Sequence, residues 1–331
     1  MRIAEGPYFE DLRVGQVFDG APAMTLTEGR AASHQVITGD RLRLPLDGEL
    51  SRRVTGSAAP VAHPALVWDV AIGQSTQVTQ HVVANLFYRG LVFHRAPRIG
   101  DTLHTRTTVT ALRQNRLRPR RPATGLAALR ITTADQDGRP VLDFRRCAML
   151  PLRDPEVSTG HRDDLNAVGA DPGVSLSAAV HGWALDAFRD AVPGPHAGGV
   201  HTGAVWEVGG GDVVSSAPEL ARLTLNIATV HHDAATAGHR LVYGGHTIGL
   251  ALSQATRALP NLVTVTGWHG CDHTGPVREG DTLTSRVEVQ QVEPLPGEAG
   301  ALAHLRSTVR ASSGPAAPHD VLDWRYVAVL A

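Results

Sequence analysis

The residues best suited to move protons lie close together in the second half of this chain. Asn226, His231 and Asp233 come first, and residues 243–246 follow them with the sequence Tyr-Gly-Gly-His. An imidazole titrates near neutral pH, so His231 could both take a proton from water and return one to carbon. Asn226 carries an amide and cannot act as a base; it could hold water or the imidazole, or it could cap neighbouring backbone donors. The stretch is therefore a candidate for acid–base chemistry centred on His231.

A repeat in the sequence points to the elements that must position these residues. Residues 100–103 and 280–283 both read Gly-Asp-Thr-Leu, and the same offset of 180 positions pairs His63-Pro64 with Tyr243-Gly244. In both copies the turn is followed by an alternation rich in β-branched residues, which indicates a strand. Such self-similarity at a fixed period predicts two structural units of one ancestry.

The repeat sets the predicted domain organisation. We expect one domain over residues 1–153 and a second over residues 201–331, which carries the His231 stretch. The intervening residues 154–200 are rich in Gly, Pro, Asp and Ala, which is typical of a linker. Their one amphipathic segment, 184–192, is expected to form a helix that packs back on a domain.

Hydrophobic patterning predicts the same order of elements in each half. In the first half a helix over 29–37 precedes an apolar helix over 65–72, which has Pro64 in its first turn, and strands then run from about 82 to 150. In the second half an apolar helix over 247–252 precedes strands from about 262 to 329. The predicted fold class is α+β, with an antiparallel sheet curled around a buried helix, twice.

Composition excludes several classes of partner. The net charge is −1 and the isoelectric point is near 7.0, so no basic surface is expected to bind nucleic acid or an anionic membrane. Cys147 and Cys271 are the only cysteines, which favours a reduced compartment over a disulfide framework. Residues 1–7 lack the apolar region of a signal peptide, and no run is long enough to span a membrane, so the expected location is cytoplasmic.

The second-half motif resembles the hydratase element of the MaoC-like acyl-CoA hydratases. The resemblance is carried by a polar residue five positions before a histidine, then an aspartate, then a glycine turn that enters a long apolar helix. Residues 9–18, 25–28, 84–86 and 100–103 are similar to the branch that contains mesaconyl-CoA hydratase. The resemblance implies a double hotdog fold and covers both halves but not the linker.

The family also implies roles for individual residues. His231 would transfer the proton, and the Gly244 N–H at the start of the buried helix would stabilise the thioester oxygen as it gains enolate charge. Most members carry Asp where this chain has Asn226, whereas the mesaconyl branch tolerates Asn. The expected substrate-binding residues are Asp233, Tyr243, Gly245, His246 and Arg240. Arg240 is the candidate partner for a carboxylate on the substrate.

The first half is expected to hold a lost site. Asp40 aligns with Asn226, but Pro45 stands where the imidazole should be. We therefore expect the first half to shape a tunnel for the acyl or pantetheine part of the substrate. The alternative that Asp40 and His231 cooperate across the two halves remains open, as does a contact between coenzyme A phosphates and the five arginines of residues 113–121, which otherwise form a solvated loop.

The leading prediction is reversible hydration of an enoyl-CoA, a branched dicarboxylic one such as mesaconyl-CoA included. Coenzyme A would enter as part of the substrate, with no separate cofactor, and a homodimer is an open expectation. No metal site is expected, because neither 231–233 nor 269–273 has the ligand spacing of a closed site. The alternatives are a dehydratase acting on a carrier protein, a thioesterase that uses Asp40 or Asp233, and a non-catalytic acyl-thioester-binding protein.

Overall fold

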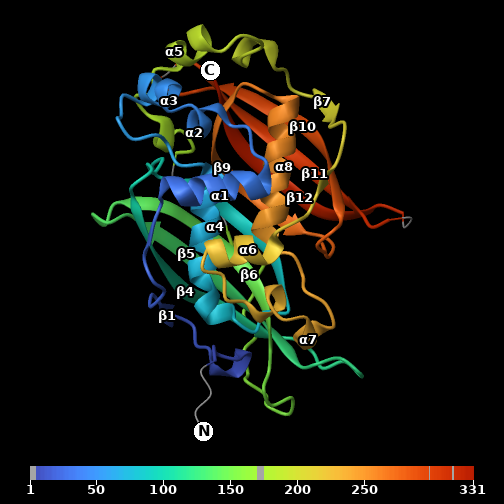
Figure 1. Cartoon of the computed structure of the whole chain (residues 1–331). Helices are drawn as coiled ribbons and strands as arrows, with labels where there is room; N and C mark the ends of the chain where they lie inside the picture. The colour runs from blue at the N-terminus through green and yellow to red at the C-terminus, as the bar shows by residue number, and fades with distance from the viewer. Residues whose placement is uncertain (1–4, 170–174, 298, 315–316) are drawn as a thin grey trace.

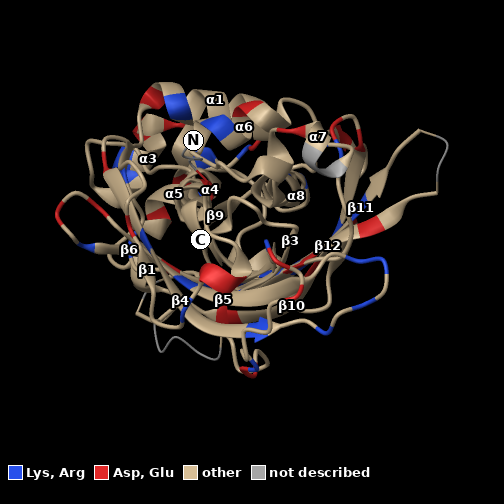
Figure 2. Cartoon of the chain, turned by 90° about the horizontal axis from the view of Figure 1, so that it is seen from below, with Lys and Arg blue, Asp and Glu red and all other residues tan. Residues whose placement is uncertain are grey.

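The computed structural model describes residues 5–169, 175–297, 299–314 and 317–331. Residues 1–4 of the N-terminal segment and 170–174 of the predicted linker lie outside the described residues. The chain folds as α+β, with one long curved antiparallel sheet and helices on its concave side (Figures 1 and 2). The predicted fold class is confirmed.

The first half builds its helices before its strands, in the predicted order. Its helices and 3₁₀ turns are η1 (Phe9–Asp11), α1 (Glu28–Thr38), α2 (Arg43–Leu46), α3 (Gly48–Thr55), α4 (Pro64–Gln74) and η2 (Ser75–Thr79). Its strands are β1 (Val17–Phe18), β2 (Met24–Thr25), β3 (Ala84–Phe93), β4 (Thr102–Gln114), β5 (Thr124–Ala134) and β6 (Pro140–Pro151). Thr27 caps α1 and Gly39, with a φ of 65°, ends it. All residues of α4 are buried, which accounts for its uniform apolarity.

The second half follows the same plan after the connecting segment. The segment and the entry to the second half contain η3 (Ala178–Val180), α5 (Leu185–Ala191), η4 (Ala197–Gly199), β7 (Val205–Glu207), β8 (Asp212–Val213) and α6 (Ala217–Leu223). The remaining elements are η5 (Thr229–His231), α7 (Ala234–Ala237), α8 (Gly244–Ala258), β9 (Leu262–His273), β10 (Thr282–Pro294), β11 (Ala301–Ser312) and β12 (His319–Leu330).

The two halves share one sheet, because β3 and β9 pair antiparallel at its centre. The strand order is β1-β4-β5-β6-β3-β9-β12-β11-β10-β7. The central helices α4 and α8 lie side by side in the hollow of this sheet, and α1 and α6 cover them from outside (Figure 2). The start of α8 lies near the end of α4, and residues of both halves surround the space between them.

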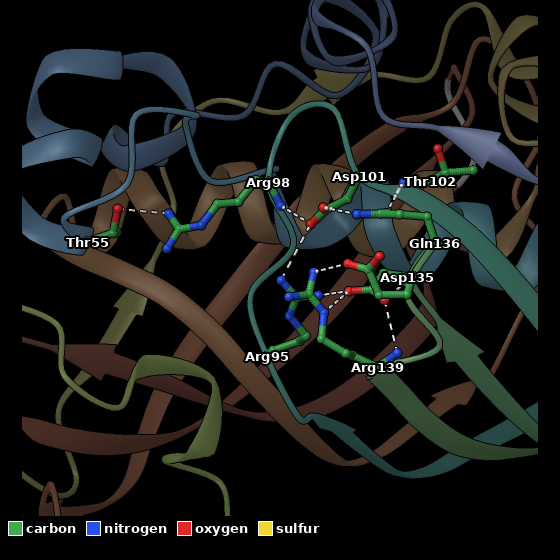
Figure 3. A network of polar contacts seen from close by, with 9 residues as sticks. Thr55, Arg95, Arg98, Asp101, Thr102, Asp135, Gln136 and Arg139 are labelled. Atoms are coloured by element: carbon green, nitrogen blue, oxygen red, sulfur yellow. Dashed lines mark hydrogen bonds and ion pairs between the residues drawn. The ribbon is translucent and has the colours of Figure 1, made fainter.

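The repeated Gly-Asp-Thr-Leu turn performs the same structural task twice. Gly100 and Gly280 have φ values of 103° and 93°, which favour glycine. Asp101 accepts a hydrogen bond from the Arg98 N–H, and Asp281 accepts one from the Arg278 N–H, each at 2.8 Å. In the first half Arg95, Gln136 and the Asp135 loop extend this contact into a polar network (Figure 3). The turn fixes where β4 and β10 begin.

The connecting segment is built into the core more fully than a linker would be. The predicted helix forms as α5, which packs against α3. Trp183 and Phe188 are buried together with Leu50 of α3 and Val263 of β9. The segment thus closes the end of the molecule where α4 begins. Among the described residues, no helix is long and apolar enough to cross a membrane.

Candidate active site

A cavity of about 320 Å³ lies where α8 begins and α4 ends. Its walls come from both halves: the end of α4 with η2, the start of β3, and β6 on one side, and residues 226–231, the start of α8 and the end of β9 on the other. Asn226, His231, Tyr243 and Gly244 all line it. The structure therefore brings together the three residues expected to be catalytic.

His231 ends η5 with its ring at the cavity wall. Its Nδ1 lies 2.9 Å from the Leu241 carbonyl oxygen, which can only accept, so the neutral ring carries its proton on Nδ1. The lone pair is then on Nε2, the nitrogen left for a ligand. Burial lowers the pKa of His231 to about 4, with a smaller contribution from the nearby charge of Arg146. His231 is accordingly a neutral base at physiological pH.

Asn226 is held in a tight turn beside this histidine. Its Oδ1 accepts a hydrogen bond from the Ala228 N–H at 2.9 Å, and its carbonyl oxygen lies 2.7 Å from Nε2 of His232. The residue before it, Leu225, has a φ of 61°, a left-handed conformation that is strained for a leucine. Asn226 therefore does cap a neighbouring backbone donor, as one of the two sequence-based expectations had it. This cap uses only the side-chain Oδ1, and Asn226 also lines the cavity.

Tyr243 and Gly244 form the entrance to α8. The Tyr243 hydroxyl donates to Asp69 of α4, 3.2 Å from Oδ1, and its ring makes an edge contact with His231 at 5.7 Å between centroids. Gly244 is the first residue of α8, so its N–H has no partner within the helix. A Cβ at Gly244 would lie 2.6 Å from Nε2 of His273, so glycine leaves room for that ring.

The other expected binding residues lie outside the cavity wall. Gly245 faces α4, because a Cβ there would be 2.0 Å from Oδ1 of Asp69. His246 is fully buried, and burial lowers its pKa to about 4. Asp233 is exposed and caps α7 through the Ala235 N–H. Arg240 is exposed and pairs with Glu279 at 3.4 Å. Gly245 and His246 thus pack in the core around α8, whereas Asp233 and Arg240 face solvent.

Three polar residues of the cavity were not among the site residues predicted from the sequence. His273 at the end of β9 is partly exposed, but desolvation of its ring lowers its pKa to about 4, and its buried Nε2 has no hydrogen-bond partner among the described residues. Asn85 on β3 has neither amide atom satisfied by the described residues, and Arg146 on β6 is buried. The repeat held a signal for all three. At the offset of 180 positions their counterparts are Phe93, Val265 and Tyr326, which are less polar.

The counterpart of this cavity in the first half is closed. A void of about 10 Å³ is lined by Val61, Ala62, Pro64, Phe93, Ala96, Pro97, Thr264 and Val265, and the residue 180 positions away from each of these lines the large cavity. Ala179 of the connecting segment also borders the void. Pro64 has no N–H to offer where Gly244 has one. The small volume and the missing donor both set the first-half position apart from the cavity of the second half.

Asp40, the acid of that first-half motif, is occupied elsewhere. It is buried, its Oδ1 lies 2.9 Å from Nε2 of His63, and it accepts a hydrogen bond from the Leu42 N–H. It is not among the described residues that line the His231 cavity. The structure thus gives Asp40 a partner at the start of α4 and no place beside His231.

Known proteins resemble this chain in sequence and in structure. No family model matches the sequence. A solved structure of RV0216, a conserved hypothetical protein from Mycobacterium tuberculosis with a double hotdog fold, is 55% identical, has a TM-score of 0.93, and covers 98% of this chain and 99% of its own. A β-methylmalyl-CoA dehydratase from Chloroflexus aurantiacus is 28% identical over 95% of this chain and 90% of its own length. A mesaconyl-CoA hydratase from Cereibacter sphaeroides is 29% identical over 87% and 84%.

These relatives span both halves and the connecting segment, so the similarity extends beyond the short motifs of the second half. The chain belongs to the MaoC-like double-hotdog family of acyl-CoA hydratases and dehydratases that its sequence resembles.

Proposed function

We propose that this protein catalyses the reversible addition of water to an α,β-unsaturated acyl thioester. The observation that carries the proposal is His231, a neutral imidazole whose Nδ1 is fixed by the Leu241 carbonyl. It lines a cavity together with Gly244, the first residue of α8. A base and an oxyanion donor that face one cavity are the two groups the reaction requires.

The reaction would use these groups in sequence. Nε2 of His231 takes a proton from water as the water oxygen attacks the β-carbon, and negative charge moves to the thioester oxygen. The Gly244 N–H and the positive end of α8 stabilise that oxygen. The imidazolium, whose low pKa makes it a strong acid, returns a proton to the α-carbon. Asn226, which lines the same cavity, would hold the water through its side-chain amide.

Coenzyme A is the proposed carrier, as part of the substrate, and the finer proposal is a branched dicarboxylic acyl group of the mesaconyl type. The names of the two curated relatives support both points. A cytoplasmic location goes with this proposal and is supported by the two free, buried cysteines. Because β3 and β9 join both halves in one chain, the site needs no second copy, and any homodimer would form outside it.

A thioesterase finds less support in the cavity. That reaction usually needs a carboxylate to attack the carbonyl or to activate water, and no Asp or Glu is among the described residues that line the wall. The carboxylate of Asp69 is close to the cavity but does not line it. It accepts a hydrogen bond from the Tyr243 hydroxyl and pairs with His34.

The test is to incubate the purified protein with crotonyl-CoA and with mesaconyl-CoA and to follow both mass and free thiol. Hydration adds one water to the thioester and releases no thiol. Release of coenzyme A thiol without an intact hydrated thioester would instead establish a thioesterase. Turnover only with the same acyl groups on a carrier protein would keep the chemistry and replace the carrier. Binding without turnover on either carrier would refute the enzymatic proposal.

A further inference from the structure

Arg146 is a buried cation that the proposed chemistry does not use. It lies on β6, is 3% exposed and lines the His231 cavity. Its Nη2 donates to the Ser75 carbonyl at 3.2 Å and to Oγ1 of Thr79 at 2.8 Å, and its Nε has no hydrogen-bond partner among the described residues. Both acceptors are neutral, so the guanidinium has no counter-charge from them.

The surroundings of Arg146 leave its charge uncompensated. Its electrostatic neighbours are the hydroxyls of Tyr88 and Tyr243 and the thiol of Cys147, and burial raises the pKa of all three groups, which keeps them neutral. Burial also lowers the pKa of Arg146 itself, which is the sign of an unpaired buried cation. A cation in such a place is costly unless an anion accompanies it.

The fold does not demand a cation at this position. Tyr326 on β12 is the residue 180 positions further on, and it pairs with Trp268 of β9 as Arg146 pairs with Tyr88 of β3. Tyr326 is fully buried and its hydroxyl lies 3.3 Å from Oγ of Ser307. An uncharged side chain thus occupies the equivalent position in the sheet. The charge of Arg146 is therefore not needed for the fold, and we look for its role in the cavity.

A second unsatisfied group faces the same space. Asn85 lies on β3, the strand that pairs with β6, and both atoms of its amide lack partners among the described residues. A guanidinium and an amide that donate from adjacent strands suit the two oxygens of a carboxylate.

We propose that Arg146, together with Asn85, binds a free carboxylate on the acyl chain of the substrate, so that the site selects thioesters of dicarboxylic acids over those of simple fatty acids. This assignment rests on the proposed function for the thioester and deepens it. It replaces Arg240, which is exposed and paired with Glu279, as the residue that recognises the carboxylate. Arg146 belongs to the first half of the chain and lines the cavity.

The experiment measures binding of saturated analogues, which cannot be hydrated. Succinyl-CoA and butyryl-CoA have four-carbon acyl chains that differ in the terminal carboxylate, and their dissociation constants are obtained by calorimetry for the parent protein. The expected preference of the parent for succinyl-CoA is at least about 30-fold, because a buried, hydrogen-bonded charge pair is lost with butyryl-CoA. A ratio near one in the parent overturns the proposal.

Three variants assign the preference to the residue. Arg146→Met is expected to bring the ratio to within about threefold of one, and Arg146→Lys to lower it several-fold, because an ammonium contacts one oxygen where a guanidinium contacts two. Arg145→Met is the matched control: Arg145 is the next residue on β6, points to the other face and pairs with Asp143, so the ratio should not change. Thermal unfolding establishes that each variant is folded.

An unchanged ratio in a folded Arg146→Met protein overturns the assignment. If that variant does not fold, an unchanged ratio in Arg146→Lys does the same. Because these ligands test binding alone, a protein that shows the preference but hydrates no enoyl thioester would keep the carboxylate site and lose the proposed function. A protein that hydrates crotonyl-CoA without any preference for succinyl-CoA would do the reverse.

Discussion

The activity at acid pH distinguishes a desolvated catalytic histidine, whose pKa is low, from an ordinary one. If His231 is the base, kcat/KM depends on its neutral form, which is present above its pKa and is lost as the pH falls through it. With a pKa of about 4, roughly 90% of His231 is still neutral at pH 5, whereas a histidine at the usual value of about 6.5 would be only about 3% neutral. The two cases therefore differ by about 30-fold in rate at pH 5.

The assay follows the ultraviolet absorbance of the enoyl thioester at limiting substrate between about pH 4.5 and 8. Coenzyme A phosphates titrate near pH 6, so the series is repeated with the pantetheine thioester, which lacks them. Circular dichroism at each pH establishes that the protein stays folded. The expected profile is nearly flat from pH 8 to pH 5. An acid limb with a midpoint near 6.5, in folded protein and with both thioesters, would refute the assignment of a desolvated, neutral base.

Three further changes test the supports of the site. Gly244→Pro removes one N–H at a helix position that accepts proline, and it should lower kcat by about 100-fold or more relative to Gly244→Ala, which adds a Cβ but keeps the N–H; equal rates would exclude the oxyanion role. His246→Leu introduces the leucine found at Leu66 of the first half. The parent should lose about 1.6 kcal/mol more unfolding free energy than this variant between pH 6.5 and 5, measured by urea unfolding, because His246 has a folded pKa of about 4 and takes up a proton more readily when unfolded. Gly245→Ala puts a Cβ against the Asp69 carboxylate and should cost about 1–3 kcal/mol, read as a lower melting temperature.

Much of the fold follows from local patterns in the sequence. Thr27 and Gly39 bound α1 as a cap and a left-handed stop, and Pro64 begins α4 where a first turn was expected. The offset of 180 positions correctly pairs the two Gly-Asp-Thr-Leu turns, because both repeat one set of backbone contacts. The junction of β3 with β9 is a contact between distant segments, so no local pattern could predict it.

The candidate site was predictable only in part, for the same reason. Asn226, His231 and Gly244 lie on one short stretch, and their motif brings them together. Arg146 and His273 reach the cavity from strands outside that stretch, where the repeat gave the only signal: each stands where the other half has a less polar residue. Arg240 lies next to the motif in sequence yet pairs with Glu279 at the surface, so proximity along the chain was misleading there.

The central claim is that His231 performs the proton transfer of a hydration. The most direct measurement compares initial rates of enoyl-CoA hydration by the parent, by His231→Ala and by His239→Ala, whose histidine is exposed and outside the cavity wall. The predicted result is a loss of at least about 100-fold in kcat for His231→Ala and an unchanged rate for His239→Ala. A folded His231→Ala protein that hydrates the thioester as fast as the parent would contradict the account.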